Sequence, residues 1–121
     1  MTIPTRSIAI VDDDGRVLES LANLVASFGY CPRPFRSAAD MLAADILSQV
    51  CGVITDREMP QMSGLDLLER IKQSGLSVPV IVITGKPSED TESFYTSRGA
   101  AGFLRKPLDG DALHCLLQRW C

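Results

Sequence analysis

Three short apolar runs constrain the fold of this chain more than any other feature of its sequence. They are SIAIV (7–11), CGVIT (51–55) and VPVIVIT (78–84), and they are rich in β-branched residues. Continuous apolar runs of this length are typical of strands that are covered on both faces, as in a parallel sheet. CPRPF (31–35) and AAGFL (100–104) are weaker strand candidates, and the two prolines of the first predict a sheet edge.

Helical patterns alternate with the predicted strands. The first has apolar residues at three- and four-residue steps and ends at Gly29, a candidate C-cap. SAAD (37–40) predicts a capping box, SGLD (63–66) opens another helix, and Asp109 is the candidate cap of the last one. Residues 88–99 are rich in Ser and Thr, which are weak helix formers, so we expect the loosest helix there.

This alternation predicts a single α/β domain over residues 1–121. The chain has 121 residues, enough for one domain and too few for two, and 45% of them are apolar. Alternating strands and helices form a parallel sheet with helices on both faces, and we expect five strands in the doubly wound order 2-1-3-4-5. Ligands of such open sheets bind beyond the carboxyl ends of the strands.

Composition and charge exclude several classes of protein. The net charge of −3 argues against direct nucleic-acid binding, which usually needs a basic surface. No apolar run reaches the roughly 20 residues that span a bilayer, and the N-terminus has no apolar signal core, so we expect a cytoplasmic domain without membrane contact. The four cysteines lack zinc-site spacing, and we expect reduced, mostly packed thiols, with the terminal Cys121 able to cross-link in vitro.

Acidic residues stand where two of the predicted strands end. Asp12, Asp13 and Asp14 follow the first strand, and Asp56 follows the third. These strands are neighbours in the predicted order, so the carboxylates would share one pocket, where like charges raise one another's pKa and a bound cation relieves the repulsion. All-oxygen ligands favour Mg²⁺, with Mn²⁺ or Ca²⁺ as substitutes, over zinc. The simpler alternative is that Asp13 or Asp14 only caps the first helix.

Two further polar residues follow later strands. Thr84 ends the fourth strand and supplies a hydroxyl donor, and Lys106 follows the fifth and supplies a point charge suited to phosphate. Each of them alone would be an ordinary turn cap or surface charge. Their occurrence with the acids, all at strand carboxyl ends in one short domain, is far more specific than any one of them.

With these residues identified, the sequence resembles the receiver domains of two-component response regulators over essentially its whole length. The strongest segments are IAIVDDDGRVLESL, VITDREMPQMSGLDLL, VIVITGKP and GAAGFLRKPL. The DxxMPxMSG and VITG patterns are similar to the FixJ-type subfamily, whose receivers precede a helix-turn-helix DNA-binding domain. The resemblance implies a flavodoxin/CheY-like (βα)5 fold.

The resemblance also implies a phosphoacceptor and a metal site. Asp56 would accept a phosphoryl group from the phosphohistidine of a sensor histidine kinase, in keeping with the ability of a carboxylate to act as a nucleophile. Asp12 and Asp13 would hold Mg²⁺, Asp13 as a direct ligand and Asp12 through a water molecule. Asp56 and the backbone carbonyl of Glu58 would complete the set of ligands. The chain would then catalyse no reaction beyond its own phosphorylation and dephosphorylation.

The remaining roles that the resemblance implies concern the switch. Thr84 would donate to a phosphoryl oxygen and be drawn toward it, and the aromatic Phe103 would move into the space that Thr84 leaves. Lys106 would pair with the phosphoryl group or with the acceptor, and its bond to Pro107 would be cis. Phosphorylation would thereby bias the surface formed by the fourth helix, fifth strand and fifth helix.

Two charged residues border the expected site at positions that vary in the family. Glu58 stands two residues after Asp56, and Lys86 stands two residues after Thr84. Our hypothesis is that they modulate hydrolysis of the acyl phosphate by partly shielding it from water. The alternative is an ordinary exposed ion pair, worth at most about 1 kcal/mol.

The output stays open between two possibilities. The chain can be the receiver half of a transcription regulator, with a C-terminal DNA-binding domain in the full-length protein and a phosphorylation-dependent homodimer as a further expectation. It can also be a stand-alone regulator or phosphate sink that acts by protein contact. No effector domain is visible within the sequence itself.

Two other classes share this type of fold. A metal-dependent phosphatase with an aspartyl nucleophile would carry a second acid two residues later, where Glu58 stands, but the rest of that pattern and a cap domain are missing. A flavodoxin-like electron carrier would need a Ser/Thr-rich phosphate turn, and an acidic pocket would repel the flavin phosphate.

Overall fold

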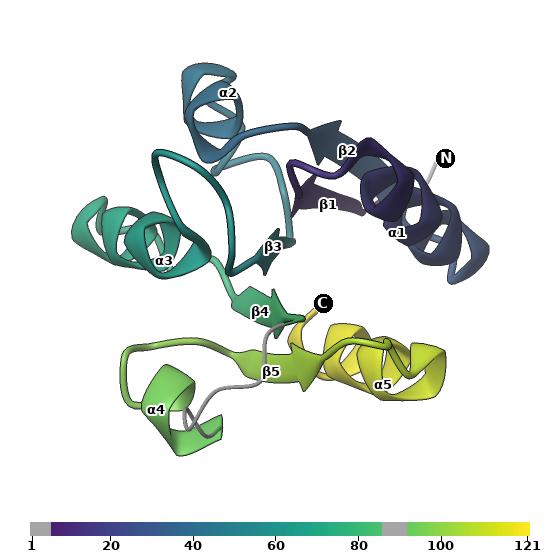
Figure 1. The fold of residues 1–121 in the computed structure, drawn as a ribbon. Helices are drawn as coiled ribbons and strands as arrows, with labels where there is room; N and C mark the ends of the chain where they lie inside the picture. The colour runs from purple at the N-terminus through teal and green to yellow at the C-terminus, as the bar shows by residue number, and fades with distance from the viewer. Residues whose placement is uncertain (1–5, 86–91) are drawn as a thin grey trace, which may run out of the picture.

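Five parallel strands form one sheet in the order β2-β1-β3-β4-β5, as the alternating pattern predicts (Figure 1). The computed structural model describes residues 6–85 and 92–121. The strands are β1 Ser7–Val11, β2 Cys31–Phe35, β3 Gly52–Asp56, β4 Val80–Thr84 and β5 Gly102–Arg105. The helices are α1 Gly15–Ser27, α2 Ala38–Ala43, α3 Gly64–Gln73, α4 Glu92–Thr96 and α5 Gly110–Trp120.

The bounds of β1 and β2 are those predicted, and the bounds of β3, β4 and β5 differ from the predicted ones by one or two residues. β3 includes Asp56, so the strand carries the acid at its last position instead of ending before it. β4 begins at Val80, immediately after Pro79, which has no N–H for the ladder but still accepts a hydrogen bond from the Val53 N–H at 2.9 Å. β2 is an edge strand, as its prolines predict.

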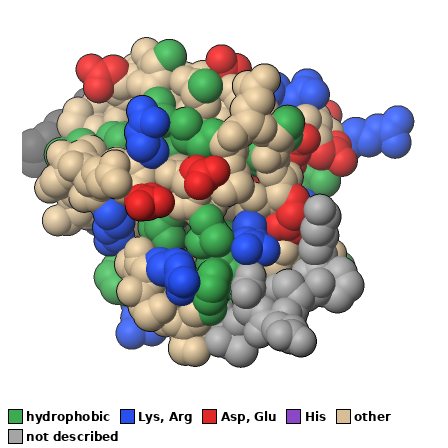
Figure 2. All heavy atoms as spheres, turned by 60° about the vertical axis from the view of Figure 1, so that its left-hand side comes forward, with side chains coloured by type: hydrophobic (Ala, Val, Ile, Leu, Met, Phe, Trp, Pro, Cys, Tyr) green, Lys and Arg blue, Asp and Glu red, His purple; other side chains and the backbone are tan. Residues whose placement is uncertain are grey.

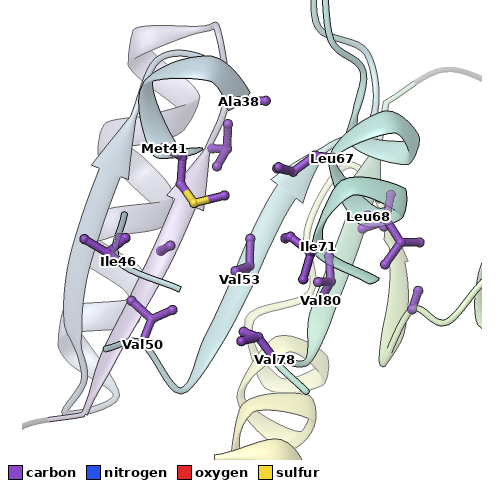
Figure 3. Close-up of a cluster of buried hydrophobic side chains, with 14 of the residues drawn as sticks. Ala38, Met41, Ile46, Val50, Val53, Leu67, Leu68, Ile71, Val78 and Val80 are labelled. Atoms are coloured by element: carbon purple, nitrogen blue, oxygen red, sulfur yellow. The ribbon is translucent and has the colours of Figure 1, made fainter. Parts of the chain in front are cut away.

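Helices cover both faces of the sheet, which explains why the strands are apolar throughout. α1 and α5 lie on one face, and α2, α3 and α4 lie on the other (Figure 1). The two resulting cores are separate: Figure 3 shows the one beneath α2 and α3, where Met41, Leu67 and Ile71 surround the β3 residue Val53. The other is built from the following buried residues: Ile8, Ile10, Leu18, Leu21, Val25, Ile54, Ile81, Ile83, Leu113 and Leu117.

Side-chain caps begin four of the helices. Asp14 caps α1 and Asp109 caps α5, each by accepting backbone N–H groups of the first turn. Ser37 caps α2 through the Asp40 N–H, which gives one half of the predicted capping box. α3 has the complete reciprocal box, between Ser63 and Asp66.

α4 is the shortest helix that the structure describes, with five residues from Glu92 to Thr96. The predicted helix over residues 88–99 is confirmed for this part, and its start lies outside the described residues. Tyr95 fixes α4 to the sheet: its side chain is completely buried, and its ring stacks on Phe103 of β5 with the centroids 4.4 Å apart. One buried aromatic ring therefore anchors a helix with few apolar residues.

The expectation that all four cysteines are reduced is wrong for two of them. Cys51, just before β3, and Cys121, just after α5, form a disulfide across a sequence separation of 70 residues. Cys31 and Cys115 are free thiols. No local spacing predicts this pair, because the fold alone brings the amino end of β3 to the carboxyl end of α5.

None of the helices in the described ranges has the length and apolar character needed to cross a membrane.

Candidate functional site

The predicted acidic residues converge at the carboxyl edge of the sheet. β1 and β3 are paired with Val11 opposite Thr55, so the residues that follow these two positions lie side by side. One oxygen each of Asp12, Asp13 and Asp56 lies within 4.8 Å of the others. Asp12 is 1% exposed and Asp56 is 5% exposed, whereas Asp13 lies at the surface.

The third acid of the triplet has a different place. The Asp14 carboxylate accepts hydrogen bonds from the N–H groups of Arg16 and Val17, at 2.9 and 3.4 Å, and so caps α1. Its own N–H donates to Asp12 Oδ1 at 2.9 Å, which fixes the orientation of that buried carboxylate. The alternative that Asp13 or Asp14 caps the first helix is therefore correct for Asp14.

Lys106 reaches both buried carboxylates from the turn that follows β5. Its ammonium nitrogen lies 3.1 Å from Asp56 Oδ1 and 3.5 Å from Asp12 Oδ2. The Lys106 N–H donates to the Thr84 carbonyl at 2.8 Å, and the Lys106–Pro107 peptide bond is cis, as predicted. Lys106 therefore links the turn after β5 to both buried carboxylates.

Burial controls the protonation of these groups. The pKa of the Asp56 carboxyl is raised to about 6: burial is the largest cause and the charge of Asp12 adds to it, whereas Lys106 lowers the pKa. Burial also raises the pKa of Asp12, against the hydrogen bond from the Asp14 N–H. For Lys106, burial lowers the pKa, but the contacts and charges of Asp56 and Asp12 outweigh it, so the pKa is raised overall. The site brings three carboxylates, those of Asp12, Asp13 and Asp56, together with one ammonium group, so it lacks positive charge.

The donor set fits a hard divalent cation. Asp12, Asp13 and Asp56 offer carboxylate oxygens only, which are the ligands that Mg²⁺ prefers, and a bound cation would supply the missing positive charge. Mg²⁺ binds through one or two carboxylates and keeps several waters, so three converging carboxylates suffice. The predicted ligand role of the Glu58 carbonyl is not tested by these contacts.

The Glu58 side chain lies in a contact that the sequence did not predict. The Thr84 hydroxyl donates to Glu58 Oε1 at 2.6 Å, and the Gly85 N–H donates to the same oxygen at 3.0 Å. Thr84 itself is 1% exposed. The expected partner of Glu58, Lys86, lies outside the described residues.

Three further residues support the site, and sequence reasoning missed them. Gly64, at the start of α3, packs so closely on the Asp56 carbonyl that a Cβ atom would overlap it. Arg36, after β2, donates two hydrogen bonds to the Asp13 carbonyl, at 3.0 and 3.2 Å. Tyr95 contacts Phe103, the predicted switch aromatic, and lies below the Arg57 guanidinium. The glycine of the MSG motif was the one available signal.

Comparison with known proteins agrees with this geometry. A family model described as the response regulator receiver domain matches residues 8–118. Response regulator protein TodT of Pseudomonas putida is 38% identical over 107 residues, which cover 88% of this chain and 47% of TodT. Transcriptional regulatory protein FixJ of Azorhizobium caulinodans is 39% identical, with coverage of 88% and 50%.

The fold of a solved structure agrees as well. The crystal structure of FixJ-N superposes with a TM-score of 0.83 at 29% identity, and covers 97% of this chain and 94% of that one. The chain spans about half the length of the curated relatives that it matches first.

Proposed function

Since this chain belongs to the response regulator receiver domain family, we propose that Asp56 accepts a phosphoryl group from the phosphohistidine of a sensor histidine kinase. The observation that carries the proposal is the convergence of Asp12, Asp56 and Lys106 at the carboxyl edge of the sheet, with the ammonium 3.1 Å from the acceptor carboxylate. An Asp56 oxygen would form a bond to phosphorus while the phosphorus–nitrogen bond of the donor breaks, and the histidine nitrogen would keep that electron pair.

Each residue of the site has a proposed part in this transfer. Asp56 attacks as the carboxylate, which its pKa of about 6 leaves as the main form at neutral pH. Lys106 offsets negative charge on the transferring group, and the Thr84 hydroxyl and Gly85 N–H, which donate to Glu58 here, would donate to a phosphoryl oxygen. Mg²⁺ held by Asp12, Asp13 and Asp56, with the Glu58 carbonyl as a further ligand, would neutralise charge on the phosphoryl oxygens.

Incubation with acetyl phosphate and Mg²⁺, followed by intact-mass measurement, tests this proposal. The wild-type chain should gain one phosphoryl group, and Asp56→Asn should gain none. Asp111→Asn, which removes an exposed carboxylate from the first turn of α5, is the matched control and should behave as wild type. Uptake by Asp56→Asn would place the acceptor elsewhere.

The proposed output is transcriptional control through a longer protein. FixJ is named a transcriptional regulatory protein, and the present chain spans about half of its length. Phosphorylation would alter the α4-β5-α5 surface through Phe103, which stacks on Tyr95, and would favour a homodimer there.

On the side of the molecule that carries α2, α3 and α4, apolar side chains lie between Lys and Arg side chains (Figure 2). A stand-alone regulator or phosphate sink is the alternative, and the length of the natural reading frame separates the two.

Glu58 and Lys86 are also proposed to slow hydrolysis of the acyl phosphate. Removal of either side chain should then speed the loss of the phosphoryl group, measured by intact mass over time after the phosphodonor is removed. An unchanged rate in both variants would contradict this role. Turnover of a small phosphate ester by the wild-type chain would instead favour the phosphatase class, in which Glu58 would be the general acid.

A further inference from the structure

The Glu58 carboxylate occupies two hydrogen-bond donors at the end of β4. Its Oε1 atom accepts from the Thr84 hydroxyl at 2.6 Å and from the Gly85 N–H at 3.0 Å. Both distances are typical of strong bonds to a charged acceptor. A hydroxyl and a backbone N–H that donate to the same oxygen can bind an anion. In this structure the anion is the carboxylate of Glu58.

The same two donors are the ones that the proposed function assigns to a phosphoryl oxygen. Thr84 belongs to the strand next to β3, which ends at Asp56, so these donors border the acceptor carboxylate. The charge of Glu58 also contributes to the raised pKa of Asp56, which places the two carboxylates within electrostatic reach of each other. Glu58 thus accepts, within electrostatic reach of Asp56, from the two donors that an attached phosphoryl group would need.

We infer that Glu58 takes the place of one phosphoryl oxygen in the unphosphorylated chain, and that phosphorylation of Asp56 displaces it from Thr84 and Gly85. This inference rests on the proposed function, and it assigns to Glu58 a part that differs from shielding the product. Glu58 is a competitor that the incoming phosphoryl group must replace, and it therefore sets how readily the site accepts phosphate.

The competition follows from the number of hydrogens available. A threonine hydroxyl has one hydrogen to donate, and a backbone amide has one. Neither can serve Glu58 and a phosphoryl oxygen with a full hydrogen bond at the same time. A phosphoryl group adds a charge of about −1.5 to −2 beside Glu58, so repulsion also drives the carboxylate away.

Displacement of Glu58 would add a second moving group to the switch. Thr84 already donates to a carboxylate oxygen before phosphorylation, so it exchanges one acceptor for another when it is drawn to the phosphoryl group. The departure of the Glu58 side chain from the site accompanies that movement. A change at the surface would then begin on the β3–α3 loop, where Glu58 stands, as well as at Phe103.

Variants at position 58 test the inference without altering the metal site, because the backbone carbonyl stays in place. Glu58→Ala removes both the charge and the acceptor, while Glu58→Gln removes the charge and keeps an acceptor oxygen. Glu69→Gln removes an exposed carboxylate from α3 and is the matched control. The measurements are the rate of phosphorylation by acetyl phosphate with Mg²⁺, and the amide NMR signals of Gly85 before and after addition of beryllofluoride with Mg²⁺.

We expect Glu58→Ala to be phosphorylated about tenfold faster than wild type, because the loss of one charge-assisted hydrogen bond corresponds to about that factor. Glu58→Gln should fall between the two, and Glu69→Gln should match wild type. In the unphosphorylated chain the Gly85 amide signal should move on Glu58→Ala. Addition of beryllofluoride should then bring the Gly85 signals of wild type and Glu58→Ala close together, because the same acceptor replaces the carboxylate in both.

An equal or slower rate for Glu58→Ala than for wild type, with Glu69→Gln normal, would overturn the inference and leave the proposed function intact. So would a Gly85 signal that does not respond to Glu58→Ala. A failure of all variants, wild type included, to take up phosphate or beryllofluoride would instead overturn the proposed function. The NMR comparison without any phosphodonor therefore separates the two failures.

Discussion

The carboxyl edge and the amino edge of the sheet have opposite effects on the stability of the fold. At the carboxyl edge, Asp12 and Asp56 are buried beside each other with one ammonium group between them, and burial raises the pKa of both. At the amino edge, the disulfide between Cys51 and Cys121 joins the start of β3 to the end of α5. The chemistry that suits phosphate and metal thus costs stability at one edge, and a covalent bond adds stability at the other.

Removal of the disulfide should have the largest effect on stability. Cross-linking residues 70 apart restricts the unfolded chain, and Cys51→Ser or Cys121→Ser should lower the free energy of unfolding by about 4 kcal/mol. Urea denaturation in the absence of reductant measures this. Cys115→Ser, at an exposed free thiol, is the control and should change little. Equal stability of Cys51→Ser and Cys115→Ser would show that the amino edge does not depend on the bond.

The crowded carboxylates should produce the next largest effect, visible as a pH dependence. The pKa of Asp56 is raised from 3.8 to about 6, so between these pH values the folded chain holds more protons than the unfolded chain. Stability therefore falls as the pH rises through this window and stays lower above it, by on the order of 2–3 kcal/mol from Asp56 alone.

Asp56→Asn isolates that contribution. With EDTA present, the variant should be more stable than wild type at pH 7.5, and the difference should vanish near pH 4. Urea denaturation at several pH values measures both proteins. A constant difference across the range would show that the carboxylate is not destabilised by its surroundings.

Much of this comparison could be predicted from the sequence. The alternation of apolar runs and helices predicts a parallel sheet, and the parallel direction of its strands places Asp12, Asp56, Thr84 and Lys106 at one edge. Local backbone preferences also gave the Ser63 capping position and the edge location of β2. The sequence predicted these features because each depends on residues that are close together in the chain, either a periodic apolar pattern or a capping or proline residue.

The contacts that could not be predicted join side chains that are distant in sequence. The bond between Glu58 and Thr84 spans 26 residues, and the contact of Arg36 with Asp13 spans 23. Each depends on rotamers and loop paths that leave no periodic signal. The Cys51–Cys121 pair is similar, because nothing near either cysteine marks its partner. The sequence therefore predicted where the site lies, but not that Arg36 supports it or that the Glu58 side chain binds its Thr84 hydroxyl.

Gly64 and Gly52 test whether the carboxyl and amino edges differ in how tightly their backbones are packed. A Cβ on Gly64, at the carboxyl edge, would overlap the Asp56 backbone, so Gly64→Ala should cost about 2 kcal/mol and displace Asp56. A Cβ on Gly52, at the amino edge, would meet Cys121 Sγ at an ordinary contact of 3.4 Å, so Gly52→Ala should stay within about 1 kcal/mol of wild type. Urea denaturation measures the stabilities, and acetyl phosphate labelling should slow only in Gly64→Ala. Equal costs would mean that both edges accommodate a methyl group alike.

The smallest expected effect on stability is a difference between Asp13 and Asp14 in their response to Mg²⁺. Asp13 contributes an oxygen to the cluster, whereas Asp14 caps α1, so the two should respond differently to metal. Mg²⁺ at ten times its dissociation constant should stabilise the wild-type chain by about 1.4 kcal/mol. Asp13→Asn should lose most of that increment, and Asp14→Asn, which keeps a capping oxygen, should retain it.

Asp14→Ala completes this test, because it should lower stability by about 1 kcal/mol with or without Mg²⁺. Thermal and urea unfolding with EDTA or Mg²⁺ measure all four proteins. Loss of the Mg²⁺ increment in Asp14→Asn, with Asp13→Asn unaffected, would reverse the assignment of these two carboxylates. The proposed ligand Asp13 and the cap Asp14 are adjacent exposed acids, so their response to the cation is what distinguishes a carboxylate that binds metal from one that caps the helix.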